Sequence, residues 1–183
     1  MSQIRIIGGE WRGRKLKVLD ADGLRPTPDR VRETLFNWLA PFISGAHCLD
    51  AFAGSGALGF ESLSRGAASV VMVDQSAEVI SLLKEEAAML KADRAEIYRA
   101  RIPSQLKKPE KPFDIVFLDP PYQADLLVQC CFYLEENSFL AREAYIYLEA
   151  SHGLCENDLP SGWTLLKSKK AGQVAYHLAQ RKK

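Results

Sequence analysis

The sequence predicts an α/β protein whose sheet has seven strands, mainly parallel, with helices on both faces. From residue 47 onward, short apolar segments alternate with amphipathic ones. The apolar segments lack a polar–apolar alternation, which indicates strands that are covered on both faces and joined by helices. The last two strands, 165–169 and 174–179, flank Ala171-Gly172 and therefore predict an antiparallel hairpin at one sheet edge.

The chain has the size and composition of a single domain. Its 183 residues are 47% hydrophobic and 26% charged, which excludes a disordered chain, a collagen or a coiled coil. A domain of this size buries enough surface to fold without disulfides or metals. We divide it into an N-terminal basic arm (1–24), an N-terminal helix (25–45) and a core (46–183).

The elements before residue 47 carry their own signals. The segment from Gln3 to Val18 places three glycines among strand-forming residues, so it predicts a short β-ribbon or arm. Thr27 is predicted to be the N-cap of a helix and Pro28 its first residue. Apolar residues then recur at helical spacing as far as Phe42 and define one buried face.

After residue 47, strands and helices follow in turn. The runs 70–73 and 113–118 are continuously apolar, and Ser76 is the predicted N-cap of a helix that ends at Leu90. The remaining predicted elements are strands at 47–50, 97–98 and 144–149, a helix at 57–65, a loop at 119–122 and a helix after that loop to about residue 136.

Basic residues gather at the two ends of the chain, although the formal net charge is only +1. The last 21 residues hold six lysines and arginines and no acidic residue. Together the two ends predict either a positive patch that attracts phosphates or ordinary solvated surface with a charged tail. The basic residues before position 20 are Arg5, Arg12, Arg14, Lys15 and Lys17.

The sequence favours a soluble cytoplasmic protein. No apolar run approaches the ~20 residues of a membrane span, and the start lacks the apolar region of a secretory signal. The four cysteines show no CxxC spacing, which fits a reducing compartment. We expect no membrane contact, no metal ion, and a monomer.

A glycine-rich turn follows the strand that ends at Asp50. Gly54 and Gly56 allow the backbone to approach a ligand closely, and the next helix begins there with free N–H groups. Asp74 ends the following strand, where a carboxylate accepts hydrogen bonds from both ribose hydroxyls. The combination predicts a cofactor that contains a nucleoside.

The same turn matches the GxGxxG pattern of dinucleotide-binding oxidoreductases through Gly54, Gly56 and Gly59. Asp50 argues against this alternative, because its carboxylate would face and repel a pyrophosphate. S-adenosyl-L-methionine has no phosphate and carries an ammonium that Asp50 is able to hold, directly or through water. We therefore predict S-adenosyl-L-methionine as the cofactor.

The chemistry is predicted to lie in Asp119-Pro120-Pro121-Tyr122, directly after an apolar strand. The two prolines make the turn rigid, and Tyr122 is suited to stack on a planar base. An exocyclic amino group is a poor nucleophile because its lone pair is delocalised into the ring. Hydrogen bonds from that group to Asp119 and to the Pro120 carbonyl favour the attacking geometry.

These segments resemble the class I S-adenosylmethionine-dependent amino-group methyltransferases, which have a Rossmann-like fold. Over nearly the whole chain the sequence is similar to the bacterial RsmD family, which methylates the N2 amino group of a guanine in 16S ribosomal RNA. The specific motifs are Arg5–Gly9, Trp11–Leu16, Arg25–Thr27, Asp29–Glu33, Leu35–Asn37 and Ser64–Ala67.

The resemblance implies a role for each matching residue. The guanine would contact Asp119, Pro120, Pro121 and Tyr122 as catalytic residues. The methionine end of the cofactor would contact Asp50, Phe52, Gly54, Ser55 and Gly56, the ribose Asp74 and Gln75, and the adenine region Arg101 and Ile102. The RNA would contact Arg5, Arg12, Arg14, Lys15, Arg25, Arg30 and Arg32.

Two departures from the family pattern and several alternatives stay open at this stage. The family commonly has Glu where Asp74 stands, and Arg101-Ile102 replaces an acidic or amide residue near the adenine. The resemblance implies a 16S rRNA partner within an assembled or partly assembled small ribosomal subunit. The alternatives are an adenine-N6 methyltransferase of DNA or RNA and a non-catalytic RNA-binding or assembly module on the same fold.

Overall fold

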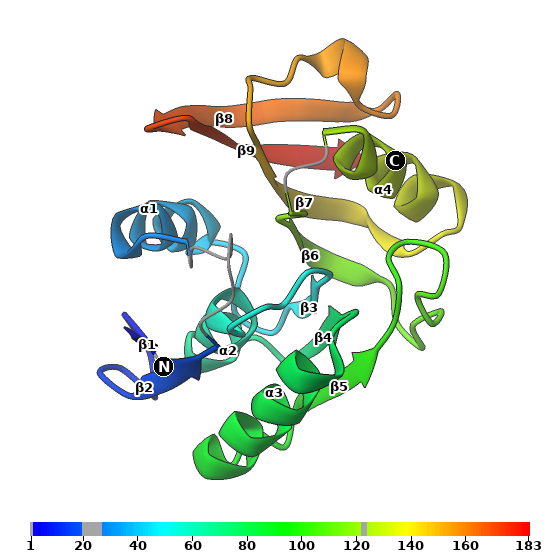
Figure 1. Cartoon of the computed structure of the whole chain (residues 1–183). Coiled ribbons are helices and arrows are strands. Elements are labelled where there is room, and N and C mark those ends of the chain that lie inside the picture. The colour runs from blue at the N-terminus through cyan, green and yellow to red at the C-terminus, as the bar shows by residue number, and fades with distance from the viewer. Residues whose placement is uncertain (1, 20–26, 122–123) are drawn as a thin grey trace.

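A computed structural model describes residues 2–19, 27–121 and 124–183 of the chain. Its main sheet has the strand order β5-β4-β3-β6-β7-β9-β8, as Figure 1 shows from bottom to top. The strands β3 to β7 run parallel, whereas β9 is antiparallel to both β7 and β8. Their bounds are β3 (His47–Asp50), β4 (Ser69–Asp74), β5 (Ala95–Arg99), β6 (Phe113–Leu118), β7 (Leu140–Ala150), β8 (Trp163–Ala171) and β9 (Val174–Lys182). The predicted seven-stranded sheet with its closing hairpin is therefore confirmed.

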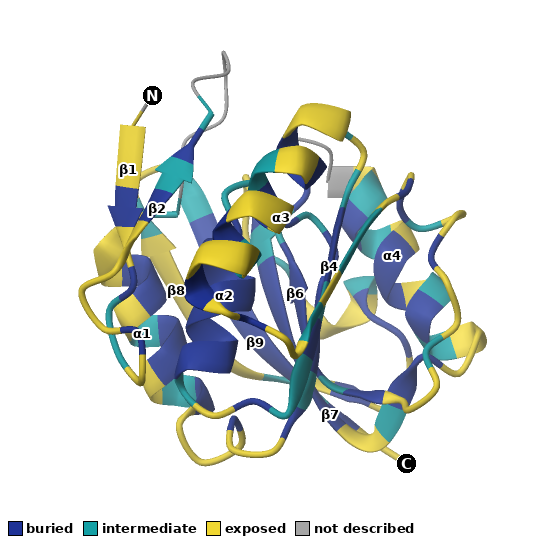
Figure 2. Ribbon diagram, turned by 90° about the horizontal axis from the view of Figure 1, so that it is seen from below, coloured by how far each residue is buried: buried dark blue, intermediate teal, exposed yellow. Residues whose placement is uncertain are grey.

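Helices cover both faces of this sheet, as predicted. Figure 2 shows α1 (Asp29–Leu39) and α2 (Ala57–Ser64) on one side, and α4 (Ala124–Glu136) on the other. The first side also holds α3 (Ala77–Leu90), whose Leu83 belongs to the same buried cluster as Leu35 of α1 and Phe60 of α2. A separate buried cluster fills the α4 side of the sheet and contains Leu127 of α4 and Leu159. Leu159 directly follows a short 3₁₀ helix, η1 (Glu156–Asp158).

The predicted N-terminal ribbon is the hairpin of β1 (Ser2–Arg5) and β2 (Lys15–Val18). It does not belong to the main sheet but lies beside α2 and α3. Ile6 and Leu16 are fully buried and Trp11 is 8% exposed, all within the cluster that fills the α1–α3 side of the sheet. The arm and the core thus share one hydrophobic interior.

The start of α1 differs from the sequence prediction. The helix begins at Asp29, Pro28 occupies the N-cap position, and no side chain caps the helix. Thr27 is therefore not the N-cap, because its hydroxyl is oriented toward Asp119 instead. At α3 the prediction is confirmed, since Ser76 Oγ accepts a hydrogen bond from the Val79 amide.

The sheet has a topological switch point between β3 and β6. From β3 the chain proceeds to β4 and β5 on one side, and then returns to the other side of β3 as β6. Open α/β sheets bind ligands at the carboxyl ends of strands beside such a point. The loops that carry the predicted site residues follow β3, β4 and β6, so the fold gathers them at that edge. Within the described ranges, no helix is long and apolar enough to cross a membrane.

Candidate active site

Four neighbouring strands each place a carboxyl group at the switch-point edge of the sheet. Asp74 and Asp50 end β4 and β3, Asp119 follows β6, and Glu149 lies near the end of β7. Alternate residues of a strand point to the same face, and Asp50 and Asp74 alternate with Cys48 and Met72 of the α1–α3 cluster. By the same rule Asp119 and Glu149 lie on the face of Phe117 and Tyr147, which belong to that cluster as well. The result is a row of carboxyl groups along one edge.

No described lysine or arginine neutralises this row. The ion pairs among the described residues involve Asp29, Glu61 and Glu135, and none of the four carboxyl groups of the row. Carboxyl groups gathered without a protein cation favour a positively charged ligand, because a bound cation relieves their mutual repulsion.

Asp50 is directed at the first turn of α2 rather than at solvent. Its side chain accepts a hydrogen bond of 3.0 Å from the Gly59 amide. The residue as a whole is only 3% exposed. The carboxylate thus satisfies one of the free N–H groups at the helix N-terminus and complements the helix dipole. In a dinucleotide-binding protein, a pyrophosphate takes this position. The arrangement supports the sequence argument against such a ligand.

The glycine turn between β3 and α2 has a geometry that requires glycine. Gly54 and Gly56 have φ angles of +50° and +76°, in the left-handed region. A Cβ on Gly56 would also lie 2.6 Å from carbons of Leu83 and Phe60. The turn is therefore fixed by both its backbone conformation and the packing behind it.

Asp74 connects this turn to the next strand. Its Oδ2 accepts a hydrogen bond of 3.1 Å from the Gly54 amide, and its Oδ1 accepts one of 2.9 Å from the Ser76 amide. Each carboxylate oxygen has a second lone pair, so these bonds leave acceptors for two hydroxyl groups. Asp74 thus holds the glycine turn in place and keeps acceptor capacity for a ligand.

Asp119 stands at the centre of the row. Thr27 Oγ1 donates to Asp119 Oδ2 over 3.5 Å, which joins the start of α1 to the end of β6. Pro120 is buried and Pro121 exposed, whereas Tyr122 lies outside the described residues. The corner therefore presents a carboxyl group that has one weak partner and a rigid backbone behind it.

Three carboxyl groups of the row, those of Asp119, Asp50 and Glu149, have raised pKa values. Burial, followed by the negative charges of Glu149 and Asp50, raises the pKa of Asp119 to about 8. Burial likewise raises the pKa of Asp50 to about 7, with the charge of Asp74 acting in the same direction. Burial also raises the pKa of Glu149, against the hydrogen bond that it accepts from Tyr147. Several groups with such shifts at one edge of the sheet indicate a functional site.

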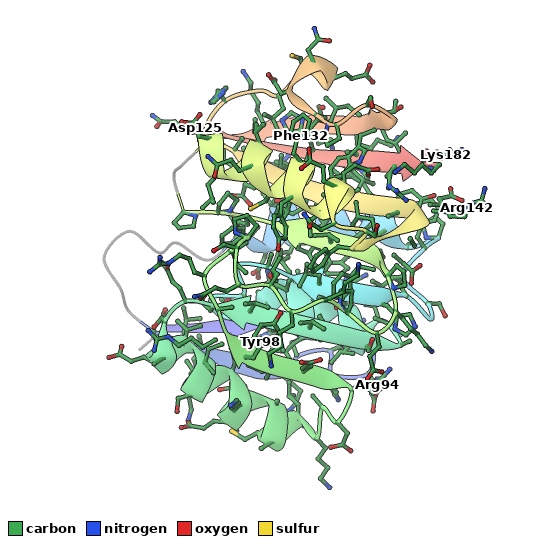
Figure 3. The ribbon with its side chains drawn as sticks, turned by 90° about the vertical axis from the view of Figure 1, so that its right-hand side faces the viewer. Arg94, Tyr98, Asp125, Phe132, Arg142 and Lys182 are labelled. Carbon is green, nitrogen blue, oxygen red and sulfur yellow. The ribbon has the colours of Figure 1, made fainter. Side chains whose placement is uncertain are left out.

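The other predicted cofactor residues lie around the same edge. Phe52 is half-buried, and Ser55 Oγ accepts a bond of 3.3 Å from the Ala57 amide. The Gln75 side chain is exposed. Beyond β5, the exposed Arg101 donates its amide to Gln105 Oε1 over 2.9 Å, and Ile102 is buried. Figure 3 shows the α4 face of the sheet, with Tyr98 of β5 and Asp125 of α4 labelled.

Comparison with known proteins identifies the family. A profile of the family described as "Conserved hypothetical protein 95" matches residues 4–180. Ribosomal RNA small subunit methyltransferase D of Escherichia coli K12 is 53% identical over 98% of this chain and 90% of its own length. The protein of the same name from Haemophilus influenzae is 47% identical over 97% of this chain and 94% of its own length. The chain belongs to the ribosomal RNA small subunit methyltransferase D (RsmD) family.

Solved structures agree with this placement in the RsmD family. A putative methyltransferase, yhhF, from E. coli has a TM-score of 0.90 at 52% identity and covers 99% of both chains. A putative methylase, HI0767, from H. influenzae has a TM-score of 0.83 at 42% identity over the full length of both chains. The fold is thus the Rossmann-like fold of class I methyltransferases.

Of the arginines and lysine predicted to contact RNA, one is placed where it is unable to do so. Arg32 of α1 is fully buried and forms ion pairs with Asp29 and Glu61, the latter over 3.7 Å. The prediction for Arg32 is therefore wrong, because its guanidinium holds the arm against the helices. Arg25 lies outside the described residues. The exposed members of the predicted set are Arg5, Arg12, Arg14, Lys15 and Arg30.

Three residues at the site are not among the predicted site residues. The sequence predicts Thr27 as a helix cap, whereas the structure pairs it with Asp119, 92 positions away. Glu149 and Tyr147 lie in β7, and Tyr147 donates to Glu149. Glu149 has a signal in the sequence, since it is a carboxylate near the end of a predicted strand, like Asp50 and Asp74.

Proposed function

We propose that this RsmD-family protein transfers a methyl group from S-adenosyl-L-methionine to the N2 amino group of a guanine in 16S ribosomal RNA. The observation that carries the proposal is the row of four carboxyl groups beside the glycine turn and the diproline corner. The choice of ribosomal RNA as the substrate rests on the names of the relatives. The proposed reaction rests on the residues of the site. We extend the proposal to a monomer that works in the cytoplasm on an assembled or partly assembled small subunit.

The residues of the site fit the proposed cofactor. A sulfonium and an ammonium are cations, and the row offers carboxyl groups that lack a described cationic partner. When bound, S-adenosyl-L-methionine supplies an electrophilic methyl group. Asp50 would hold the ammonium, and Asp74 would accept hydrogen bonds from the ribose hydroxyls, since both retain free lone pairs.

The corner after β6 is suited to orient an exocyclic amine. Asp119 and the Pro120 carbonyl would each accept one N–H of the guanine amino group, which directs the nitrogen lone pair outward. Placed acceptors of this kind lower the barrier by positioning and by stabilising the developing positive charge on nitrogen. Asp119 then takes the proton that the methylated amine must lose, and the carboxylate becomes a neutral carboxyl group.

The RNA must present the base unstacked, because the corner lies at the end of a strand rather than on an open surface. The exposed cations of the N-terminal hairpin would contact the phosphate backbone. They set affinity and orientation, whereas base contacts at the corner set the specificity. The hairpin is held firmly for this purpose, since Glu61 accepts the amides of Ile7 and Gly8, each over 2.9 Å.

The test is transfer of tritium from methyl-labelled S-adenosyl-L-methionine to 16S rRNA, to small ribosomal subunits and to DNA, followed by digestion to nucleosides. We expect label in N2-methylguanosine from RNA alone. Label in N6-methyladenosine would establish the adenine alternative, and absence of transfer to any substrate would favour a binding module.

Two variants separate the roles within the site. Asp119→Ala is expected to abolish transfer while calorimetry still detects cofactor binding. Asp74→Ala is expected to weaken cofactor binding first. Asp93→Ala, at an exposed position between α3 and β5, is the matched control and should leave both measurements unchanged. Near-normal turnover of the Asp119 variant would contradict the role assigned to that residue.

A further inference from the structure

Glu149 lies beside Asp119 in the sheet. Leu118 of β6 pairs in register with Leu148 of β7, so the residues that follow them, Asp119 and Glu149, are neighbours across the two strands. Parallel neighbours are separated by about 4.8 Å, and side chains at equivalent positions point to the same face. The negative charge of Glu149 is also the largest charge effect on Asp119. The two carboxyl groups therefore face one common space.

Each of the two groups has an oxygen available to a ligand. Glu149 Oε2 accepts a hydrogen bond of 2.9 Å from the Tyr147 hydroxyl, and Asp119 Oδ2 accepts the long bond from Thr27. Among the described residues, nothing donates to Glu149 Oε1 or to Asp119 Oδ1. Two acceptors without a described donor thus lie at equivalent positions of adjacent strands.

Guanine is the base whose edge matches two adjacent acceptors. Its N1–H and its N2 amino group are neighbouring donors on the Watson–Crick edge, the edge by which enzymes read an unstacked base. Adenine has a lone pair at N1, which a carboxylate would repel. We infer that Glu149 is a specificity-determining residue that accepts the N1–H of the target guanine while Asp119 accepts its N2–H. This inference rests on the proposed function, since it names how that site selects its base.

Tyr147 acts as a positioning residue in this arrangement. Its ring is fully buried against the α1–α3 side of the sheet, so its hydroxyl holds Glu149 at a fixed place. The same strand carries a matched pair at its other end, where the Tyr145 hydroxyl donates to Glu143 Oε1 over 2.9 Å. Glu143 is exposed and remote from the carboxyl end of β7, so this pair is the natural control.

The experiment compares two target bases that share the 2-amino group. A 16S rRNA with guanine at the methylated position is compared with a 16S rRNA that carries 2-aminopurine at that position. Both RNAs are prepared by splinted ligation. They are assembled with small-subunit proteins if the wild-type enzyme requires it. 2-Aminopurine has a lone pair at N1 in place of the N–H. It also lacks the O6 of guanine, but that loss is common to all protein variants and cancels when they are compared. Single-turnover rates are measured for wild type, Glu149→Gln, Tyr147→Phe, Glu143→Gln and Tyr145→Phe.

We expect the wild type to prefer guanine by about 100-fold or more, because a site built to receive an N–H strongly rejects an analogue that lacks it. Glu149→Gln should reduce the preference at least tenfold, since its amide is able to donate to the N1 lone pair of 2-aminopurine. Tyr147→Phe should reduce the preference less, with the dissociation constant for S-adenosyl-L-methionine unchanged. The two control variants should keep the wild-type preference.

Each result has a distinct meaning. If the wild type forms no N2-methylguanosine, the proposed function fails. If the wild type forms it but shows no preference, or if Glu149→Gln retains the full preference, the inference about Glu149 fails while the proposed function stands. Should Glu149→Gln not fold, as judged by thermal melting, the preference of Tyr147→Phe decides, and an unchanged value overturns the inference.

Discussion

Arg32 and Glu61 are both fully buried and face each other between α1 and α2, with 3.7 Å from Arg32 Nη1 to Glu61 Oε2. Glu61 also accepts a hydrogen bond of 2.8 Å from Arg65 Nε, and Arg32 Nη2 donates one of 3.0 Å to the carbonyl oxygen of Arg5. Through these two side chains the N-terminal hairpin is joined to the helices that border the site. The pair therefore couples the arm to the core.

Glu61→Ala should destabilise the protein by about 3–5 kcal/mol, because it leaves the buried guanidinium of Arg32 without its buried counter-charge. Two backbone amides of the arm would lose their acceptor as well. Urea unfolding measures the effect. Glu33→Ala, an exposed substitution on α1, is the control and should stay within about 0.5 kcal/mol of wild type. Equal stabilities for the two variants would show that the ion pair does not hold the arm.

The glycine turn offers a test of crowding against backbone strain. Gly56 and Gly45 have nearly the same φ, +76° and +75°, but only Gly56 has neighbours that a Cβ would meet. Gly45→Ala should cost about 1–2 kcal/mol from the left-handed conformation alone. Gly56→Ala should cost about 1–3 kcal/mol more through overpacking against Leu83 and Phe60, and should weaken cofactor binding in calorimetry. If both variants lose a similar amount of stability, the side chains behind the turn accommodate a Cβ without cost.

Asp50 predicts how stability depends on pH. Its pKa in the fold, about 7, lies above its ordinary value, so the fold favours the protonated form. The stabilisation is fully present below about pH 4 and is lost as the pH rises through 7. Between pH 5 and 8.5 the ligand-free wild type should therefore lose stability relative to Asp50→Asn, on the order of 1–4 kcal/mol. Urea unfolding at several pH values, with Asp93→Asn as the control, measures this loss. A constant difference would show that Asp50 titrates normally.

The rate of methyl transfer should also depend on pH. Asp119 must be ionised to take the proton that the methylated amine loses, and its pKa of about 8 in the free protein lies well above the usual range. We expect kcat/KM to rise up to about pH 8, with an apparent pKa that belongs jointly to Asp119 and Glu149, since the groups influence each other. The charge of Asp50 and the Thr27 hydroxyl also act on Asp119, in opposite directions. Glu149→Gln removes one charge and should shift the rise to lower pH. A profile flat from pH 6 to 9 would refute the assignment.

The arm predicts a salt dependence of RNA binding. Arg12 is exposed in the hairpin turn, whereas Arg142 of β7 lies near Lys182 of β9, outside the hairpin (Figure 3). Arg12→Ala should weaken binding to 16S rRNA and reduce the slope of log K against log salt by about 0.7–0.9, the value of one phosphate contact. Arg142→Ala is the matched control and should leave the slope unchanged. Filter binding at several salt concentrations distinguishes the two. The same slope for both variants would show that the arm does not contact phosphates.

The sequence predicted those features whose cause is local. Neighbouring residues determine the strands that are apolar on both faces, the Ser76 cap and the glycine turn. The structure contains the predicted strands and the Ser76 cap. The errors and omissions involve partners distant in the chain. Arg32 appears as a surface cation in sequence, but Glu61 and the arm enclose it. Thr27 has the right chemistry for a cap, yet its partner is Asp119. Glu149 ends a predicted strand, but its position beside Asp119 follows from the register of β6 with β7.

The shared interior of the hairpin and the helices has a practical consequence. A shortened protein that starts at residue 25 would expose the surface of α2 and α3 that now packs on Ile6, Trp11 and Leu16, and would leave Glu61 without its amide donors. Such a fragment would aggregate rather than serve as a minimal enzyme. Redirecting the protein to another RNA is better attempted by exchanging the exposed side chains of the hairpin turn, where substitution leaves the interior intact.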